Sequence, residues 1–358
     1  MLLMSNLYLL HAYSPSNSGD GTLVQESVDL ARSTGYLGKI TIVALDVDGF
    51  ERMLAGQPHL HVISLPGFFK HMIVAMFSRD EYVFLGVGGG YLRSSNLQEG
   101  LKTFVAHGSQ LFLSSLPRKV ERIYLPQSIG PLKGLFGMLL SRLLVGVDTI
   151  LARDDKTLIE LKERNRKLNV VRANDLVARR ILADFESNPR FNPEKVALVL
   201  RDLPSHKVAA DYGEKLRRLY DLLGVPTLLI QSEGRGNDDV AFYKNLFPGV
   251  PTFPARSFLS QTPCIVVSVR LHGSLEAIHQ GSPSVHLSYE RKGFAAFEDL
   301  GLLKYCDDSS SFVPEDIAKR VDEIKSSPET YWALIGNAAL SHIDNTKDCV
   351  AYALRRKA

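Results

Sequence analysis

The stretch Cys264–Ser288 reads CIVVSVRLHGSLEAIHQGSPSVHLS. Residues 264–269 are largely apolar and predict a buried strand, whereas residues 272–280 predict a helix. This helix is expected to end at the Gly-Ser-Pro of 281–283, because glycine and proline commonly follow a last helical turn. Residues 284–288 predict a second strand. A strand, a helix and a strand in this order are typical of the parallel βαβ unit, so the expected fold class is α/β.

The same alternation runs along the rest of the chain. Further strands are expected over 7–12, 40–45, 62–65, 82–86, 123–127, 149–152, 195–201 and 226–231. Further helices are expected near 21–34, 97–116, 133–145, 155–164, 208–223, 238–246, 313–325 and 328–355. This pattern predicts two Rossmann-like domains with a cleft between them, in which ligands bind outside the carboxyl ends of the strands.

The polar segment 184–193 (DFESNPRFNP) is rich in turn-forming residues. It predicts the domain boundary, with an N-terminal domain over 1–184 and a C-terminal domain over 185–358. The last helix, over 328–355, is expected to cross back to the first domain. At 358 residues the chain has the length of two sizeable domains.

Composition excludes several classes of protein. Hydrophobic residues make up 45% of the chain and charged residues 23%, which excludes a disordered chain. The 42 basic and 39 acidic residues leave a net charge of +3, which does not indicate a nucleic-acid binder. The cysteines Cys264, Cys306 and Cys349 are odd in number and far apart, so we expect a reducing compartment and a cytoplasmic protein.

Two apolar segments leave open whether the protein also contacts a membrane. Residues 135–147 contain Arg142 and are too short to span a bilayer, so they predict an amphipathic helix. Packing on a sheet is the favoured reading of this helix, and contact with the inner face of a membrane is the alternative. The cluster Phe68, Phe69, Met72, Ile73, Met76 and Phe77 has the same two readings. The start of the chain lacks the features of a signal peptide.

Candidate ligand-binding residues follow the predicted strands of the first half. Asn17, Gly19 and Asp20 lie between the first strand and the first helix, where backbone N–H groups can face an anion, and Asp20 is also a suitable N-cap. The glycines of 88–90 directly follow the fourth strand and permit close backbone approach. They match neither a Walker A loop nor a dinucleotide fingerprint.

Charged residues follow other strands in the same way. Arg153 and Arg201 each leave an apolar strand, and Gln127 ends another. For Arg153, the simple structural explanation is an ion pair with an aspartate at the helix start, with Asp154 or Asp155 as the N-cap. Arg270 and His272 follow the strand of 264–269. An arginine there can bind a carboxylate or phosphate through two parallel hydrogen bonds, and a histidine beside it can exchange a proton near neutral pH.

No metal site is expected from the pattern of histidines and carboxylates. His59 and His61 lie close together, but no carboxylate cluster accompanies them.

The chain resembles the polysaccharide pyruvyl transferase family over about residues 11–303. The matching pieces, in family order, are Asn17-x-Gly19-Asp20, Gly88-Gly89-Gly90, Gln127-x-Ile129-Gly130-Pro131, Arg153-Asp154, Ser268-x-Arg270-Leu271-His272, Gly281-x-Pro283, and Ser288-Tyr289 with Lys292. The family is similar in fold to two-domain GT-B glycosyltransferases. The resemblance implies a donor side in the C-terminal domain and an acceptor side in the N-terminal domain.

The resemblance also implies a reaction. Members of the family transfer an enolpyruvyl unit from phosphoenolpyruvate to two hydroxyls of a sugar, which makes a cyclic pyruvate ketal on a polysaccharide or its precursor. No cofactor is implied, and whether the acceptor is a lipid-linked oligosaccharide stays open. Arg153, Arg270 and His272 fall on catalytic and donor-binding positions. The substrate-binding residues expected beside them are Asn17, Gly19, Asp20, Gly88, Gly89, Gly90, Gln127, Arg201, Glu290 and Lys292.

Two other functions stay open at the level of sequence. Glu276 followed by Gly281-Ser282-Pro283 looks like the donor segment of glycosyltransferases that use nucleotide sugars, but the paired glutamate eight positions earlier is Ser268. A catalytically silent sugar-binding protein is the third reading. Thermal shift separates the three, because each protein is stabilised by its own ligand: phosphoenolpyruvate, a nucleoside diphosphate, or a sugar alone.

Overall fold

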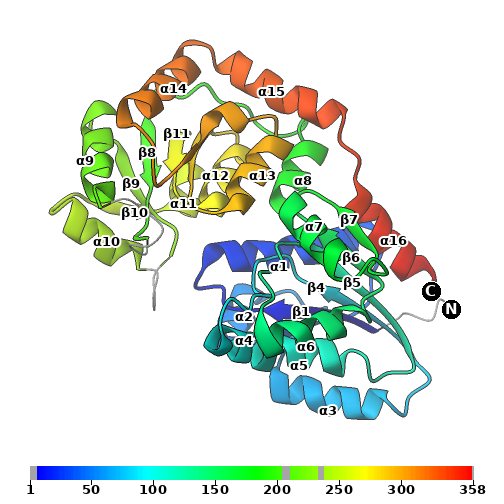
Figure 1. Cartoon of the computed structure of the whole chain (residues 1–358). Coiled ribbons are helices and arrows are strands. Elements are labelled where there is room, and N and C mark those ends of the chain that lie inside the picture. The colour runs from blue at the N-terminus through cyan, green and yellow to red at the C-terminus, as the bar shows by residue number, and fades with distance from the viewer. Residues whose placement is uncertain (1–5, 204–209, 233–237, 357–358) are drawn as a thin grey trace. The chain divides into compact units, whose positions relative to one another are not determined.

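A computed structural model of the chain describes residues 6–203, 210–232 and 238–356. The chain forms two compact units (Figure 1). Unit 1 comprises Met1–Pro15, Gly19–Leu176 and Asp344–Ala358, and unit 2 comprises Ser16–Ser18 and Val177–Ile343. The division at 176/177 lies before the polar segment 184–193, because the helix α8 (Leu176–Ala183) packs Ile181 and Leu182 into the core of unit 2.

Unit 1 is built on a sheet of seven parallel strands in the order β3-β2-β1-β4-β5-β6-β7. The strands are β1 (Asn6–Ala12), β2 (Ile40–Ala44), β3 (Leu60–Ser64), β4 (Glu81–Gly86), β5 (Lys119–Gln127), β6 (Thr149–Ala152) and β7 (Val170–Arg172). The helical segments of this unit are α1 (Ser18–Ser33), α2 (Val47–Met53), α3 (Leu65–Ala75), α4 (Leu97–Thr103), the π-helical η1 (Phe104–Gly108), α5 (Ser109–Leu113), α6 (Gly134–Leu144), α7 (Asp155–Arg164) and α16 (Asn345–Arg356).

Unit 2 repeats this plan with six parallel strands in the order β10-β9-β8-β11-β12-β13. The strands are β8 (Val196–Val199), β9 (Thr227–Ile230), β10 (Thr252–Pro254), β11 (Ile265–Ser268), β12 (Ser284–Ser288) and β13 (Cys306–Asp308). Its helices are α9 (Tyr212–Leu222), α10 (Asp239–Leu246), α11 (Ala255–Leu259), α12 (Leu271–His279), α13 (Arg291–Asp299), the 3₁₀ turn η3 (Leu303–Tyr305), α14 (Pro314–Ser326) and α15 (Pro328–Leu340).

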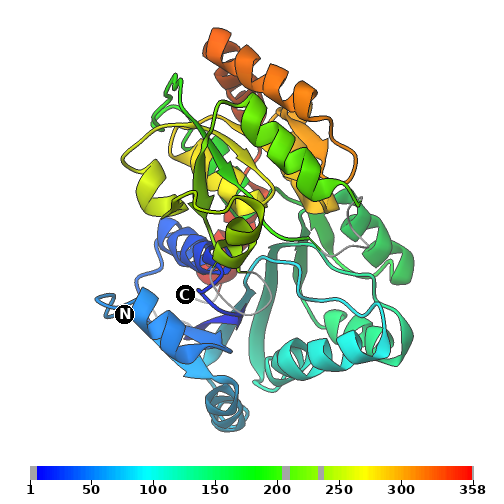
Figure 2. The same cartoon turned by 90° about the vertical axis from the view of Figure 1, so that its left-hand side faces the viewer.

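Both sheets bury side chains on both faces, which is why their strands read as continuous apolar runs. In unit 1, Leu7 and Leu9 of β1 pack in one core with α1, α2 and α16, whereas Tyr8 and Leu10 pack on the opposite face with α3 and α5. Helices therefore cover both faces of the sheet, as Figure 2 shows for each unit. The predicted α/β fold with two Rossmann-like sheets is confirmed.

The structure corrects several expected elements. The single helix expected over 328–355 is two helices: α15 belongs to unit 2, and α16 packs Val350 and Leu354 into the core of unit 1. The helix expected over 97–116 is divided by the π-helical turn η1. Residues 208 and 209 of another expected helix lie outside the described residues. The strands β7, β10 and β13 are absent from the sequence prediction because each has only three residues at or near a sheet edge.

The strand order places candidate residues at the switch point of each sheet. In unit 1, β2 and β3 are added on one side of β1, and β4 to β7 are added on its other side, so the strand order reverses between β1 and β4. In unit 2 the order reverses in the same way between β8 and β11. Open α/β sheets bind ligands outside the carboxyl ends of the strands at this point. The glycines 88–90 follow β4, and Arg201 and Arg270 follow β8 and β11.

Candidate functional site

The glycine turn after β4 is held against the end of β5. A Cβ on Gly88 would lie 2.7 Å from the carbonyl oxygen of Pro126, so a side chain at this position would force the two segments apart. The carbonyl of Gly89 accepts a hydrogen bond from the N–H of Ser128 at 2.8 Å. A Cβ on Gly90 would lie 3.6 Å from Nη2 of Arg153. The turn therefore keeps the space beside this guanidinium nitrogen free of a side chain.

Arg153 is buried and pairs with an aspartate that the sequence analysis did not identify. Its Nη1 donates to Oδ2 of Asp175 at 2.8 Å, and its Nε donates to Oγ of Ser128 at 3.0 Å. Both members of the ion pair are at least 97% buried. Asp154 caps α7 by accepting the N–H of Thr157, which confirms one of the two expected caps. The ion pair expected between Arg153 and an aspartate at this helix start is instead made with Asp175.

Gln127 and the start of α1 complete the candidate residues around the first sheet. Gln127 is fully buried, and its carbonyl accepts the backbone N–H of Arg153 at 3.2 Å. It therefore connects the glycine turn, through a bridge to Gly89, with Arg153 at the exit of β6. Asp20 lies in the first turn of α1 rather than at its N-cap, because the helix begins at Ser18.

A buried polar cluster under the glycine turn was not expected from the sequence. His11 adopts a left-handed backbone conformation with φ 73°, and its Nε2 lies 2.5 Å from the hydroxyl of Tyr124. Nδ1 of His11 lies 3.3 Å from Nδ1 of His107, which sits in the π-helical turn, and the ring of Tyr91 packs on both. Burial lowers the pKa of His107 to about 4 and, with His107, holds the pKa of His11 well below its usual range. Both imidazoles are therefore neutral at pH 7.

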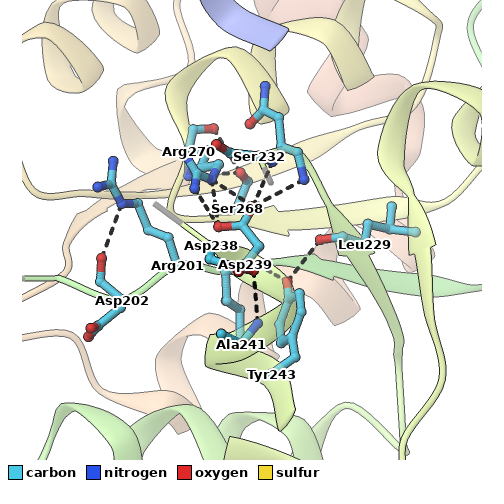
Figure 3. Close-up of polar contacts among 12 residues, drawn as sticks. Arg201, Asp202, Leu229, Ser232, Asp238, Asp239, Ala241, Tyr243, Ser268 and Arg270 are labelled. Atoms are coloured by element: carbon cyan, nitrogen blue, oxygen red, sulfur yellow. Dashed lines mark hydrogen bonds and ion pairs between the residues drawn. The ribbon is translucent and has the colours of Figure 1, made fainter. Parts of the chain in front are cut away.

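Arg270 follows β11 at the switch point of the sheet in unit 2, and like Arg153 it pairs with a buried aspartate (Figure 3). Its Nε lies 3.0 Å from Oδ2 of Asp239, and its Nη2 donates to Oδ1 of the same carboxylate. The Asp239 carboxylate also accepts the backbone N–H groups of Gln231 and Ser232 at 3.1 and 3.0 Å. Asp239 therefore fixes the guanidinium at the exit of β11 from one edge, through Nε and Nη2.

His272 lies in the first turn of α12, two residues after Arg270, and is half-buried. A positive charge on His272 lowers the pKa of the deeper His286 of β12. Nδ1 of His286 lies 2.9 Å from the carbonyl oxygen of Ser268, and because a carbonyl only accepts, Nδ1 carries the proton. Burial lowers the pKa of His286 to about 3, against the effect of this hydrogen bond. His286 is thus a neutral structural histidine beneath the β11–α12 turn.

The remaining candidates of unit 2 form two local contacts. Nη1 of Arg201 donates to the hydroxyl of Tyr289 at 2.8 Å, and the guanidinium carbon lies 5.1 Å from the centre of that ring. Lys292 and Glu290 form an ion pair at 3.1 Å at the start of α13, and both are half-buried. Arg201 and Tyr289 therefore join the exits of β8 and β12, on either side of β11.

The polysaccharide pyruvyl transferase family model matches residues 54–291, which is more than half of the chain. The chain belongs to this family. The matched region contains the glycine turn, Arg153 and the whole segment from Ser268 to His272. No curated protein matches the chain.

Solved structures with the same fold come from other enzymes. They include the glycotransferase of kitacinnamycin (14% identity, TM-score 0.51, covering 99% of both chains) and UDP-GlcNAc 2-epimerase from Neisseria meningitidis bound to UDP-GlcNAc (14%, 0.51, 94% of this chain and 98% of that chain). An alpha-glucosyltransferase in complex with UDP and DNA has 10% identity and a TM-score of 0.55, and covers 97% of this chain and 99% of that chain. Identities this low show the fold alone, and they confirm the GT-B-like two-domain α/β fold.

Within this pyruvyl transferase family member, the candidate residues fall into two local groups. One surrounds the glycine turn and Arg153 in unit 1, and the other surrounds Arg270 and His272 in unit 2.

Among the described residues, no three His, Cys, Asp or Glu side chains are grouped as a metal site. Burial raises the pKa of Cys264 to about 11 and also raises that of Cys306, so neither is a reactive thiolate. In the described part of the chain, no helix is long and apolar enough to cross a membrane.

Proposed function

We propose that the chain is a pyruvyltransferase that uses phosphoenolpyruvate to form a cyclic pyruvate ketal on a sugar of a polysaccharide or its precursor. The observation that carries this proposal is the segment from Ser268 to His272. It lies inside the matched family region at the switch point of the second sheet, and it sets a buried, oriented arginine two residues before a histidine.

In the proposed reaction, a proton adds to the methylene carbon of phosphoenolpyruvate and creates a cation-like centre at the neighbouring carbon. One sugar hydroxyl attacks this centre and loses its proton. The second hydroxyl then forms the other C–O bond and loses its proton, while the bond to phosphate breaks and phosphate leaves with the electron pair. One proton is taken up by carbon and two are released, of which phosphate keeps one.

The donor has a phosphate and a carboxylate, so it needs cationic partners with defined geometry. We assign Arg270 as the main donor contact in unit 2, with Arg201 as a further member of the same anion site, and Arg153 as the candidate donor contact of unit 1. The aspartate partners of Arg153 and Arg270 neutralise much of the net charge. Donor recognition would therefore rest on directed N–H groups more than on a surplus of positive charge.

His272 is the proposed general acid for the methylene carbon. A helix start favours the neutral imidazole, whereas the trianionic donor favours the protonated one, so protonation is expected to accompany donor binding. Replacing His272 by Gln should keep the fold and lower turnover about a hundredfold or more, the usual size of a general-acid contribution. Near-normal turnover with an unchanged pH profile would leave His272 as a donor ligand only. Glu290, paired with Lys292, and Asp20 are candidates for deprotonating the sugar.

The direct test measures phosphate release from phosphoenolpyruvate in the presence of a panel of pyranosides and nucleotide sugars. The expected product is an acceptor that has gained one carboxyethylidene group, and in D₂O its new methyl group carries one deuterium from solvent. Hexose transfer from a nucleotide sugar, with no phosphate released from phosphoenolpyruvate, would instead support the alternative glycosyltransferase. Arg270→Lys is the matched control, because it keeps a positive charge beside Asp239 but cannot form two parallel hydrogen bonds.

A further inference from the structure

One face of unit 1 exposes large apolar side chains on several neighbouring helices. On α3, Phe68 and Met72 are fully buried against the sheet, as the packing interpretation of this segment predicted. Phe69, Ile73 and Val74 point outward from the same helix. Phe77, just beyond the end of α3, is also exposed, and both it and Val74 are 72% exposed. The helix is therefore apolar on its outer side as well as its inner side.

The same outward pattern continues on α4, η1 and α5. Leu97, Leu101 and Val105 are spaced four residues apart, which places them on one side of a helix, and Phe112 follows on α5. All four are 48–73% exposed.

Helix α6 adds a third stripe. Leu135, Met138 and Val145 are 44–56% exposed at helical spacing. Helix α3 contacts α5, and α6 contacts α4, η1 and α5, so the three stripes adjoin. Figure 1 shows these helices on the same side of the first sheet. We call the outer surface of α3, α4, η1, α5 and α6 the apolar face.

The charges on the apolar face are almost all positive. The elements α3, η1, α5 and α6 contain no Asp or Glu, and the single carboxylate of α4, Glu99, lies 3.9 Å from Nε of Arg93. Lys70, Lys102 and Arg142 are exposed among the apolar side chains. The opposite side of the same sheet differs: among its described residues, α1 and α2 have no large exposed apolar side chain, and both helices carry several carboxylates.

We propose that the apolar face is a docking surface for an anionic lipid bilayer. Outward apolar side chains enter the boundary between headgroups and acyl chains, and the flanking lysines and arginine meet the lipid phosphates. A second copy of the chain would fit this face poorly, because its symmetric approach would bring the same basic residues toward one another. This inference does not depend on the proposed reaction, since binding to lipid is measured without substrate.

The test measures sedimentation of the full chain with vesicles of phosphatidylglycerol and phosphatidylcholine, compared with vesicles of phosphatidylcholine alone. We expect about tenfold or greater preference for the anionic vesicles at low salt, and loss of this preference at high salt. The double variant Val74→Ser/Phe77→Ser should bind about tenfold or more weakly. Lys70→Gln/Lys102→Gln should lose roughly fivefold per charge on anionic vesicles only.

The matched control is Tyr352→Ser, which removes a 61% exposed aromatic ring from α16, on the opposite side of the same sheet. It should bind as the wild type does, and circular dichroism should show all variants folded. The proposal fails if the wild type does not sediment with anionic vesicles, or if Tyr352→Ser loses as much binding as the α3 variant. A dimer in solution that the α3 variant converts to a monomer would assign the face to a second copy instead.

Discussion

The pair of Arg270 and Asp239 makes a quantitative prediction about stability. Replacing Arg270 by Met keeps much of the side-chain volume but removes the cation next to a carboxylate that is 99% buried. The two backbone N–H groups that Asp239 retains, from Gln231 and Ser232, do not carry a full charge. Breaking a buried ion pair from one side typically costs about 3–5 kcal/mol, and we expect a loss of that size in the free energy of unfolding of unit 2.

A second substitution separates the buried charge from the lost packing. Asp239→Asn removes the negative charge, and its amide oxygen still accepts a hydrogen bond from the backbone of Gln231 or Ser232. In the double variant the buried charge is gone, so we expect it to be about 2 kcal/mol more stable than Arg270→Met alone. Arg270→Met and the double variant Arg270→Met/Asp239→Asn both lack the guanidinium, so neither should turn over phosphoenolpyruvate.

The chain offers a local probe for this measurement. Its one tryptophan, Trp332, lies buried on α15 in unit 2, so its fluorescence during urea unfolding follows that unit. A loss below about 1 kcal/mol in Arg270→Met would mean that the Asp239 carboxylate does not depend on this cation, since an unpaired buried carboxylate destabilises a fold by more than that. A double variant no more stable than Arg270→Met alone would show that the loss comes from packing and not from the buried charge.

Three further predictions concern other parts of the two groups. Arg153→Met should destabilise unit 1 by about 3 kcal/mol or more, and adding Asp175→Asn should restore part of this, as measured by hydrogen exchange of the strands in unit 1. His286 stays neutral in the folded state down to a pKa of about 3, but takes up a proton near pH 6.5 when unfolded. The stability that depends on neutral His286 is therefore fully present above pH 6.5 and is lost as the pH drops toward 3. The free energy of unfolding should fall by about 1.4 kcal/mol between pH 7.5 and 5.5 because of this residue. His286→Asn should remove that part of the slope in urea unfolding followed by Trp332 fluorescence; an unchanged slope would mean that this histidine is protonated in the folded state. Gly90→Val should cover Nη2 of Arg153 and weaken phosphoenolpyruvate binding about tenfold in calorimetry, whereas unchanged affinity would exclude a ligand at that nitrogen.

Much of the fold follows from the pattern of apolar runs. Central parallel strands are buried on both faces, so β1, β4 and β11 are legible as continuous apolar segments with a polar or glycine residue at the exit. The candidate residues were found because they stand at those exits. The short strands β7, β10 and β13 were missed because three residues carry too little pattern to distinguish a strand from a loop.

The partners of the arginines could not be predicted from local sequence. Asp175 lies 22 residues from Arg153, and Asp239 lies 31 residues from Arg270. The first pair forms because β6 and β7 are neighbours. The second pair forms although β8 separates β9 from β11, so it depends on the order of strands in the sheet. At the start of α7 the sequence did indicate Asp154 as a possible cap, but local spacing could not show that Arg153 pairs with the more distant Asp175.

Calorimetric titration measures whether the Arg270 site binds phosphoenolpyruvate, and it needs no knowledge of the acceptor sugar. The wild-type chain should bind phosphoenolpyruvate, with competition from inorganic phosphate, and should not bind UDP. Arg270→Lys, folded by circular dichroism, should bind the donor about thirtyfold or more weakly, because it loses the two parallel hydrogen bonds. Binding of UDP without any binding of phosphoenolpyruvate, or equal donor affinity in the wild type and Arg270→Lys, would exclude Arg270 as the residue that binds this donor.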